Sequence, residues 1–424
     1  MQEIQTFIKL HEKSILTTMF VVFATIQLLL YPLLGLTPFH DSDCYIEAAQ
    51  QVLNESQFYP SDRMLYGADF LWNIGAINMV AFSLRCFQSI VPLLVLYALL
   101  KSVSLLLIYY ITRKCFTPTA AMLSALLFML YPANYGDVTS VLSEVPFAFL
   151  VLLAVLLYQY KHPVWAGFAL GCADYIRPFA LIFIIALLVC NYKHIRRHAQ
   201  LLIAYFAVIL SISSANYVCK GQFIYKAKTG WMALAQYHYD NDRYKDTPNP
   251  QLIAYNYNID YNEKDREWQR SFFAWLRNNK GEYLRQIPIK IARTYVSDNT
   301  SFCAFLPDDI KKDGDTMYDK SLSMKTMVQS FPHYCAAQWM ALANLLFYYA
   351  LLVIFALSLP YLKHFKLSWA IVVTGTLFIA LVGHGESRFH HAFMPFIIMA
   401  DAGYIMLWYK KVMQRKCSTL KESV

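Results

Sequence analysis

Charged residues are scarce in this sequence. Only 15% of its 424 residues are Asp, Glu, Lys or Arg, whereas 57% are hydrophobic. A water-soluble protein of this length could not bury so much apolar surface, but lipid solvates such surface in a protein with several membrane spans. The composition therefore excludes an ordinary soluble domain and favours an all-α polytopic membrane protein.

The sequence also lacks common metal motifs among its cysteines and near Arg388. Its nine cysteines form no Cys-x-x-Cys pair, and the histidines near Arg388 show no His-x-x-x-His or His-Glu-x-x-His spacing. The adjacent His390 and His391 are expected on different faces of a helix, which disfavours a shared metal ion there. Cys219, Cys303 and Cys335 share one long polar segment. If that segment is extracytoplasmic, one disulfide can form among them, but the sequence does not give the pairing.

About ten apolar segments are long enough to suggest helices in the membrane, and together they divide the chain into three parts. We expect a transmembrane catalytic module over residues 1–217, a mostly helical extracytoplasmic domain over 218–335, and transmembrane helices with a cytoplasmic tail over 336–424. The fifth and sixth segments are shorter than the ~20 residues of a straight crossing, so we expect them to form a hairpin. The predicted spans are 15–36, 89–112, 117–133, 141–160, 163–175, 177–191, 199–217, 336–360, 367–383 and 391–409.

The loop charges predict the orientation of these spans. Most Lys and Arg residues of the short loops fall on one side of the membrane, and by the positive-inside rule that side is cytoplasmic. Both termini then face the cytoplasm. The first apolar segment is long and no small-residue cleavage site follows it, so we expect no cleavable signal. The compact chain suggests a bacterial inner membrane. The net charge of +9 is spread over these loops instead of one face, which argues against a nucleic-acid partner.

Two outward segments are large. Residues 38–88 mix apolar residues with Asn73, Asn78 and Arg85, which predicts helices lying in the membrane interface. Residues 218–335 contain a predicted helix pair, with a helix stop at residues 278–281 and a second helix starting near Glu282.

Four groups of polar residues fall at the outward ends of the predicted spans. Charges at a membrane boundary are costly to keep beside apolar helices, so such groups are candidates for a functional site. Each also has a structural explanation: solvated loop carboxylates, a Glu at a helix N-terminus, or an Arg that extends to the interface. The groups are His40, Asp41 and Asp43; Tyr131, Asp137 and Glu144; Asp174 and Arg177; and His384, Glu386, Arg388, His390 and His391.

Lys101 is unusual because it lies in the middle of the second predicted span. It has three readings: the side chain extends to the interface, contacts a lipid phosphate, or pairs with a buried acid, for which Asp401 in the last span is a candidate.

The order of these motifs resembles the GT-C glycosyltransferases, in particular protein O-mannosyltransferases and the aminoarabinose transferase of lipid A (glycosyltransferase family 39). The resemblance rests on "HDSD" after the first span, "MLYPANYGD" at the third, "SEVPFAFLVLLAVLLY", "YIRPFALI" and "ESRFHHAFMPFIIM" near the last. Two departures are the "HDSD" itself, where many members have one Asp or a Glu-Asp pair, and Phe389, where the family has Tyr. The resemblance implies a GT-C fold.

The resemblance also implies an activity: transfer of a sugar from a polyprenyl-phosphate donor to an acceptor hydroxyl at the outer face, with inversion. Asp41 would then be the general base, with Asp43 and Glu144 assisting it. Arg177, Arg388 and Lys101 would bind the donor phosphate, and His40, Asp137 and Tyr131 would lie near the acceptor. No cofactor is certain, although Asp41 and Asp43 are oxygen ligands that suit a divalent cation.

The acceptor stays open between a glycan, a lipid and a protein, and membrane lipid is a further partner. Two other classes of function also remain. One is a transporter or flippase for a lipid-linked sugar, which intramembrane Lys101 and Asp401 and the broken fifth and sixth spans would suit. The other is a non-catalytic subunit of a glycan assembly system.

Overall fold

The protein is helical throughout the part that the structure describes. The computed structural model describes residues 2–37, 39–239, 249–298, 305, 336–383 and 385–422. In these ranges the ordered elements are α-helices and short 3-10 helices, which confirms the expected all-α class.

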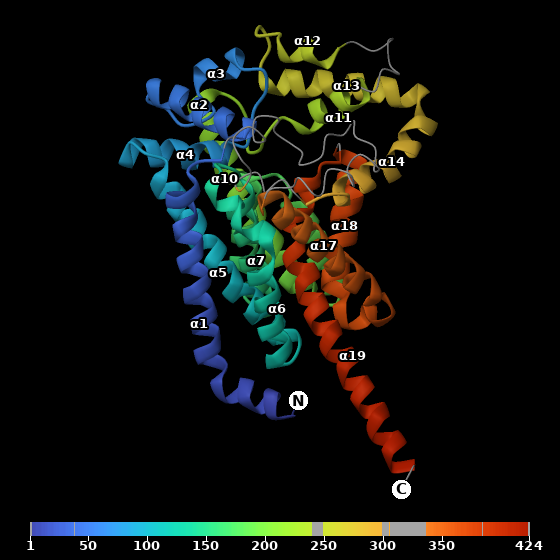
Figure 1. Cartoon of the computed structure of the whole chain (residues 1–424). Helices are drawn as coiled ribbons and strands as arrows, with labels where there is room; N and C mark the ends of the chain where they lie inside the picture. The colour runs from blue at the N-terminus through green and yellow to red at the C-terminus, as the bar shows by residue number, and fades with distance from the viewer. Residues whose placement is uncertain are drawn as a thin grey trace.

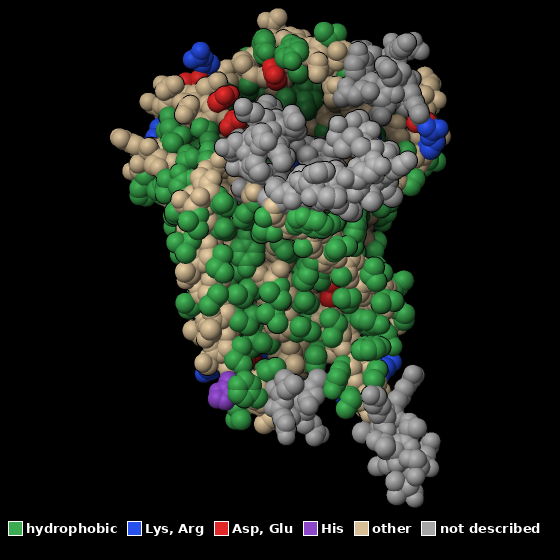
Figure 2. All heavy atoms as spheres, viewed as in Figure 1, with side chains coloured by type: hydrophobic (Ala, Val, Ile, Leu, Met, Phe, Trp, Pro, Cys, Tyr) green, Lys and Arg blue, Asp and Glu red, His purple; other side chains and the backbone are tan. Residues whose placement is uncertain are grey.

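Five described helices are long and apolar enough to cross a membrane, and a bent pair adds a sixth candidate. The exposed surface of the helical bundle is mostly hydrophobic along its middle, and Lys and Arg side chains gather towards its two ends (Figure 2). Leu33, Ile203 and Leu210, for example, are each more than half exposed. Lipid is the solvent that suits such a belt, so the chain is a multi-pass integral membrane protein. The five spans are Thr6–Leu34, Val91–Cys115, Ile195–Lys220, Trp339–Leu357 and Leu359–Val382, and the pair is Pro132–Thr139 with Glu144–Gln159.

Each of the ten predicted spans contains a helix, but several of these helices are short. The structure therefore supports five or six candidate spans, and the expected count of about ten is not shown. The two segments predicted to be short are indeed short: α8 and α9 have only 14 and 11 residues, and they contact each other. The ten helices are α1 (Gln2–Leu34), α5 (Val91–Cys115), α6 (Pro118–Leu130), α7 (Glu144–Gln159), α8 (Pro163–Ile176), α9 (Ala180–Cys190), α10 (Ile195–Lys220), α17 (Ala336–Leu357), α18 (Leu362–Val382) and α19 (Met394–Glu422).

Two glycines let α8 and α10 approach each other closely. Gly167 and Gly171 are four residues apart, so they lie on one face of α8. A Cβ at Gly167 would lie 2.1 Å from the carbonyl oxygen of Leu201, and one at Gly171 would lie 2.6 Å from Cβ of Val208. Small residues at this spacing are a common device for packing helices in membranes.

The remaining helices form a layer over one end of the bundle, opposite the end where α1 begins and α19 ends (Figure 1). We call it the outer layer, and the two segments that build it the outer segments. The first outer segment supplies α2 (His40–Asn54), α3 (Asp62–Gly67) and α4 (Ile74–Phe87). The second supplies α11 (Gly230–Tyr239), α12 (Pro250–Ala254), α13 (Tyr261–Asn278) and α14 (Lys280–Tyr295).

The predicted helix pair of the second outer segment is confirmed by α13 and α14, which meet at Asn279. The side chain of Asp260 caps α13 by accepting hydrogen bonds from the backbone N–H groups of Asn262 and Glu263. Trp268 and Phe272 are buried on one face of α13 and hold it against neighbouring helices of the layer.

Three short 3-10 helices complete the part that positions the site. The chain leaves α6 at Tyr131 and passes through η1 (Pro132–Tyr135) and η2 (Asp137–Thr139) before α7 begins at Glu144. Between α18 and α19 it forms η6 (Ser387–Ala392). Because these segments lie at helix ends under the outer layer, their polar side chains reach a common space at the boundary between bundle and layer.

Candidate functional site

A cavity lies where these helix ends meet. Its apolar wall comes from α6, α7, α9 and the start of α19, including Phe128, Phe147, Phe183 and Phe393. Its polar wall comes from α5, η1, η2, the ends of α7 and α8, and η6. The polar lining residues are Lys101, Tyr131, Asn134, Asp137, Glu144, Arg177, Arg388 and His391.

Asp41 joins this wall through an ion pair with Arg388. The Oδ2 atom of Asp41, in the first turn of α2, lies 2.5 Å from Nη1 of Arg388 in η6. A second carboxylate, that of Glu386, lies 3.0 Å from Nε of the same arginine. Burial alone would lower the pKa of Arg388, but Glu386, Glu144 and Asp41 together raise it above its ordinary value.

Glu144 and Arg177 form a second ion pair in the cavity. Oε1 of Glu144 and Nη1 of Arg177 are 2.6 Å apart, and both side chains are about nine-tenths buried. Arg177 also donates a hydrogen bond of 2.9 Å to the hydroxyl of Ser143. Its guanidinium lies over the rings of Phe179 and Phe389. The cation is therefore held rigidly at the end of α8 by a charge, a hydroxyl and two aromatic faces.

Lys101 pairs with Asp137, and the suggested pairing with Asp401 is wrong. Nζ of Lys101 lies 2.7 Å from Oδ2 of Asp137, and both side chains are mostly buried. Asp401 is fully buried further along α19 and has no hydrogen-bond partner among the described residues. Lys101 is thus part of the cavity wall, because η2 brings Asp137 over the middle of α5.

Asp43 is not brought to the cavity. Residues two apart on an α-helix do not face each other, and in α2 Asp41 is half-buried against Arg388 while Asp43 is exposed. Asp41 and Asp43, which the sequence offered as possible ligands of a divalent cation, therefore point in different directions. His40 is the first residue of α2.

Asp174 takes a structural role beside the site. Its carboxylate accepts hydrogen bonds from the backbone N–H of Ala180 and from the hydroxyl of Tyr205. These bonds join the end of α8 to α9 and α10, which fixes the turn that carries Arg177.

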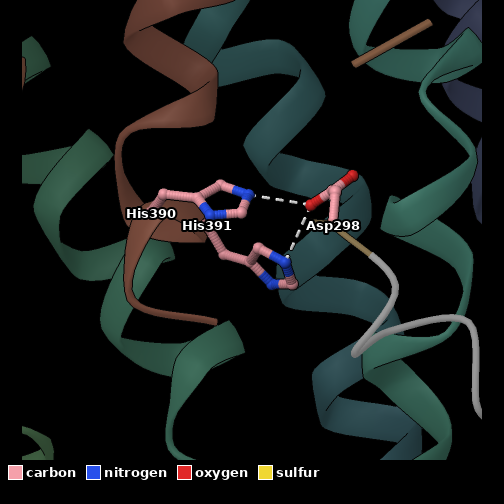
Figure 3. A group of neighbouring side chains, drawn as sticks. All are labelled: Asp298, His390 and His391. Atoms are coloured by element: carbon pink, nitrogen blue, oxygen red, sulfur yellow. Dashed lines mark hydrogen bonds and ion pairs between the residues drawn. The ribbon is translucent and has the colours of Figure 1, made fainter. Parts of the chain in front are cut away.

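A buried cluster of Asp298, His390 and His391 adjoins the cavity (Figure 3). Both imidazole rings turn towards the carboxylate of Asp298, and their Nε2 atoms lie 2.9 and 3.0 Å from its Oδ1 atom. Tyr131 donates its hydroxyl to the other oxygen of that carboxylate. The expectation that the two histidines face different directions is wrong, because they belong to a short 3-10 segment and both reach one atom.

The partners of Asp298 govern its charge. Burial alone would raise the pKa of Asp298, but hydrogen bonds from His390 and His391 lower it below its ordinary value. Burial opposes the charging of His391, yet Asp298 and then Asp137 raise the pKa of this histidine. No motif or spacing pointed to Asp298, which follows α14 in a polar segment. His384, Cys303 and Cys335 lie outside the described residues, and Cys219 is a free cysteine.

Comparison with known proteins gives one family match. The model of glycosyltransferase family 87 matches residues 78–251, a stretch that includes Lys101, Tyr131, Asp137, Glu144 and Arg177. This part of the chain is similar in sequence to glycosyltransferases of that family. The likeness to family 39 that the motifs suggested is not shown. No curated protein matches the chain.

Solved structures of an archaeal oligosaccharyltransferase are similar in arrangement. The enzyme of Archaeoglobus fulgidus tethered to an acceptor peptide has a TM-score of 0.49 and 15% identity over 96% of this chain and 51% of that one. The enzyme named AglB, from the same organism and in complex with an inhibitory peptide and a dolichol-phosphate, has a TM-score of 0.45 and 13% identity over 98% and 52%. The chain spans about half the length of these structures.

Proposed function

We propose that the protein is a membrane glycosyltransferase with a GT-C type of fold. It transfers a sugar from a polyprenyl-phosphate donor to an acceptor hydroxyl at the outer face of the membrane. The observation that carries this proposal is the cavity, where acids and bases from segments far apart in the sequence meet between an apolar helical wall and the outer layer. The match to glycosyltransferase family 87 over residues 78–251 supports the same class.

The mixed lining of the cavity suits a lipid-linked donor. A polyprenyl chain needs apolar contact, which the aromatic and aliphatic wall formed by α6, α7, α9 and α19 offers. Its phosphate needs fixed cations, and Arg177, Arg388 and Lys101 line the opposite side. We therefore assign donor phosphate binding to these three residues.

Asp41 is the proposed general base. A carboxylate can act as a general base where it lies within hydrogen-bond reach of the acceptor hydroxyl, and Asp41 lies at the edge of the cavity with its side chain about one-fifth exposed. Without a donor, Arg388 neutralises Asp41 at 2.5 Å. We propose that the donor phosphate replaces Asp41 as the ion-pair partner of Arg388. Asp41 is then free to accept the proton of the acceptor hydroxyl, while the hydroxyl oxygen attacks the anomeric carbon. The donor phosphate leaves on the opposite side with its charge balanced by the arginines.

The other polar residues have supporting places in this proposal. Glu144 fixes Arg177, and Asp137 fixes Lys101. Tyr131, Asp137 and His40 are assigned to the neighbourhood of the acceptor. We also propose that both termini face the cytoplasm, so that the outer layer of helices lies on the opposite side of the membrane. An acceptor then reaches the cavity beneath this layer. A glycan, a lipid and a protein remain the acceptor classes.

The test is direct turnover. The purified chain in lipid nanodiscs is incubated with a panel of polyprenyl-phosphate sugars, and the released polyprenyl phosphate is measured by mass spectrometry with candidate acceptors present. Release that depends on the cavity residues supports the proposal. If every donor stays intact with every acceptor class, and the donors nevertheless cross the bilayer in proteoliposomes, the protein is a transporter and the proposal fails.

A further inference from the structure

Each ring nitrogen of His390 faces an oxygen acceptor. Nδ1 of His390 lies 2.7 Å from the carbonyl oxygen of Thr294, which can only accept, so this nitrogen carries the hydrogen. A neutral ring can donate from only one nitrogen, so the contact between Nε2 and Oδ1 of Asp298, 2.9 Å apart, needs a further positive charge, either a second proton on the ring or a metal ion.

The second oxygen of Asp298 is already fully used. Oδ2 accepts the hydroxyl of Tyr131 and the amide of Asn344, the latter at 3.1 Å. The carboxylate is therefore oriented with Oδ1 towards the two imidazoles. In addition, the ring of His390 is packed between Tyr295 and Tyr348, which fixes its plane. Outer partners of this kind, which orient the ligand atoms, are characteristic of metal sites.

We infer that Asp298, His390 and His391 form a binding site for one divalent transition-metal ion, with zinc as the best match. The three candidate ligand atoms lie within 4.8 Å of one another. Two imidazole nitrogens and one carboxylate oxygen suit Zn²⁺, which takes three protein ligands and a water in its open sites. Asp298 and His390 are fully buried, and His391 lies on the cavity wall, so the fourth position is within reach of water there.

The ion can be admitted by a rearrangement of the three side chains, whose ligand atoms lie within 4.8 Å of one another. Metal–ligand bonds of about 2.0–2.1 Å in a tetrahedron separate the ligands by about 3.3 Å. The present separations between Oδ1 of Asp298 and the two Nε2 atoms are 2.9 and 3.0 Å. These two separations must open by a few tenths of an ångström, and the two imidazoles must rotate so that their nitrogens also lie about 3.3 Å apart.

The ion would join two segments that carry different parts of the molecule. Asp298 follows α14 of the outer layer, whereas His390 and His391 belong to η6, which also carries Arg388. The metal therefore ties the outer layer to the bundle beside the cavity. This inference does not depend on the proposed function, because its readouts need no substrate.

The experiment measures metal content and metal-dependent stability. The chain is purified without a metal-affinity step, stripped with a chelator and reloaded with Zn²⁺, and bound zinc is counted by mass spectrometry while thermal unfolding is followed. We expect one zinc per chain and a higher melting temperature with zinc. Asp298→Asn and His390→Gln should lose the bound zinc. His194→Gln, which changes an exposed histidine at the start of α10, should keep it.

A spectroscopic readout on the unchanged chain covers the case in which the variants do not fold. Co²⁺ in place of Zn²⁺ should give the visible absorption of a tetrahedral nitrogen–oxygen site, and excess Zn²⁺ should abolish it. No bound Zn²⁺ or Co²⁺ in the wild type, or equal zinc in the Asp298→Asn and His194→Gln variants, would overturn the inference. The cluster would then be an ion pair with a protonated His390.

Discussion

The carboxylate of Asp41 and the guanidinium of Arg388 form an ion pair at 2.5 Å although the two residues are 347 positions apart in the sequence. Asp41 lies in the first turn of α2 and Arg388 in η6, so the contact joins the first outer segment to the approach of the last helix. Each side chain is about one-fifth exposed. The pair therefore lies at the boundary between the apolar bundle and water, where the proposed lipid donor and acceptor would meet.

Replacing Arg388 should weaken donor use more than acceptor use. Arg388→Lys keeps the charge but loses the planar fork that matches a phosphate, and Arg388→Ala loses both. We expect kcat/KM for the donor to fall about tenfold in the lysine variant and about a hundredfold in the alanine variant, in line with ~1.5–3 kcal/mol for a hydrogen bond to a charged group. Steady-state kinetics with the donor varied at saturating acceptor measures this. Unchanged donor kinetics in both variants would remove Arg388 from the phosphate site.

The Glu144–Arg177 pair should behave as one unit in stability. Removing one partner leaves the other charge buried, which costs about 3–5 kcal/mol, whereas replacing both with neutral side chains costs much less. Glu144→Gln and Arg177→Met should each lower the melting temperature strongly, and the double variant should lose less than the sum of the two. Thermal unfolding in detergent gives all three values. Additive losses would mean that the 2.6 Å contact contributes no coupling.

Close packing of α8 on α10 should make Gly171 intolerant of larger side chains. A Cβ there would lie 2.6 Å from Cβ of Val208, so Gly171→Leu must push the two helices apart. We expect a destabilisation of at least ~1–3 kcal/mol. Gly281→Ala is the matched control, because a Cβ at Gly281 meets nothing within 4 Å. It should be neutral or slightly stabilising, and equal melting temperatures for the two variants would contradict the close contact.

Lys290 should make stability depend on pH in the alkaline range. Burial lowers the pKa of Lys290 from its ordinary 10.5 to about 8, while the rings of Tyr237 and Tyr283 lie near its ammonium. The unfolded chain thus binds more protons than the folded one between pH 8 and 10.5, so this residue makes stability rise with pH in that window. Below pH 8 Lys290 is charged in both states, and burial of its ammonium then lowers the free energy of unfolding by about 3 kcal/mol before the ring contacts are counted.

The Lys290→Met variant measures this effect. It should be more stable than the wild type at pH 7, and its advantage should shrink as the pH rises from 8 towards 10. Melting temperatures of both proteins over that range give the comparison. Lys280→Met, which removes an exposed lysine at the start of the same helix, corrects for the loss of a surface charge. An advantage that grows with pH would have the wrong sign for a buried ammonium.

Much of the architecture followed from local sequence signals. Apolar runs located the membrane helices, and the start of α7 at Glu144 and the break at Asn279 followed from helix-end residues. The number of spans did not follow, because hydropathy does not show whether the short α6, α8 and α9 cross the bilayer. The short length of these helices is set by breaks such as Pro132 and Arg177–Pro178 together with packing against longer neighbours.

Part of the site could also be predicted, because several of its residues lie at helix ends that the sequence marks. Glu144, Arg177 and Arg388 fall at helix ends, and the predicted topology placed these ends at one face of the membrane. In the structure all three residues line the cavity. Asp298 was missed because a single acid in a polar segment has no periodicity or spacing, and its importance arises only when η6 packs against the end of α14. Asp43 was included because it lies two residues from Asp41 in the sequence. The turn of α2 leaves its side chain exposed to solvent.

The central claim is that Asp41 accepts the proton of the acceptor at this boundary. It is tested most directly by the rate of polyprenyl-phosphate release in purified Asp41→Asn and Asp43→Asn variants, with the melting temperature of each as a check on folding. A general base contributes roughly 10²–10⁴-fold to the rate. We predict a loss of that size for Asp41→Asn and near wild-type release for Asp43→Asn, and a folded Asp41→Asn variant with wild-type turnover would contradict the account.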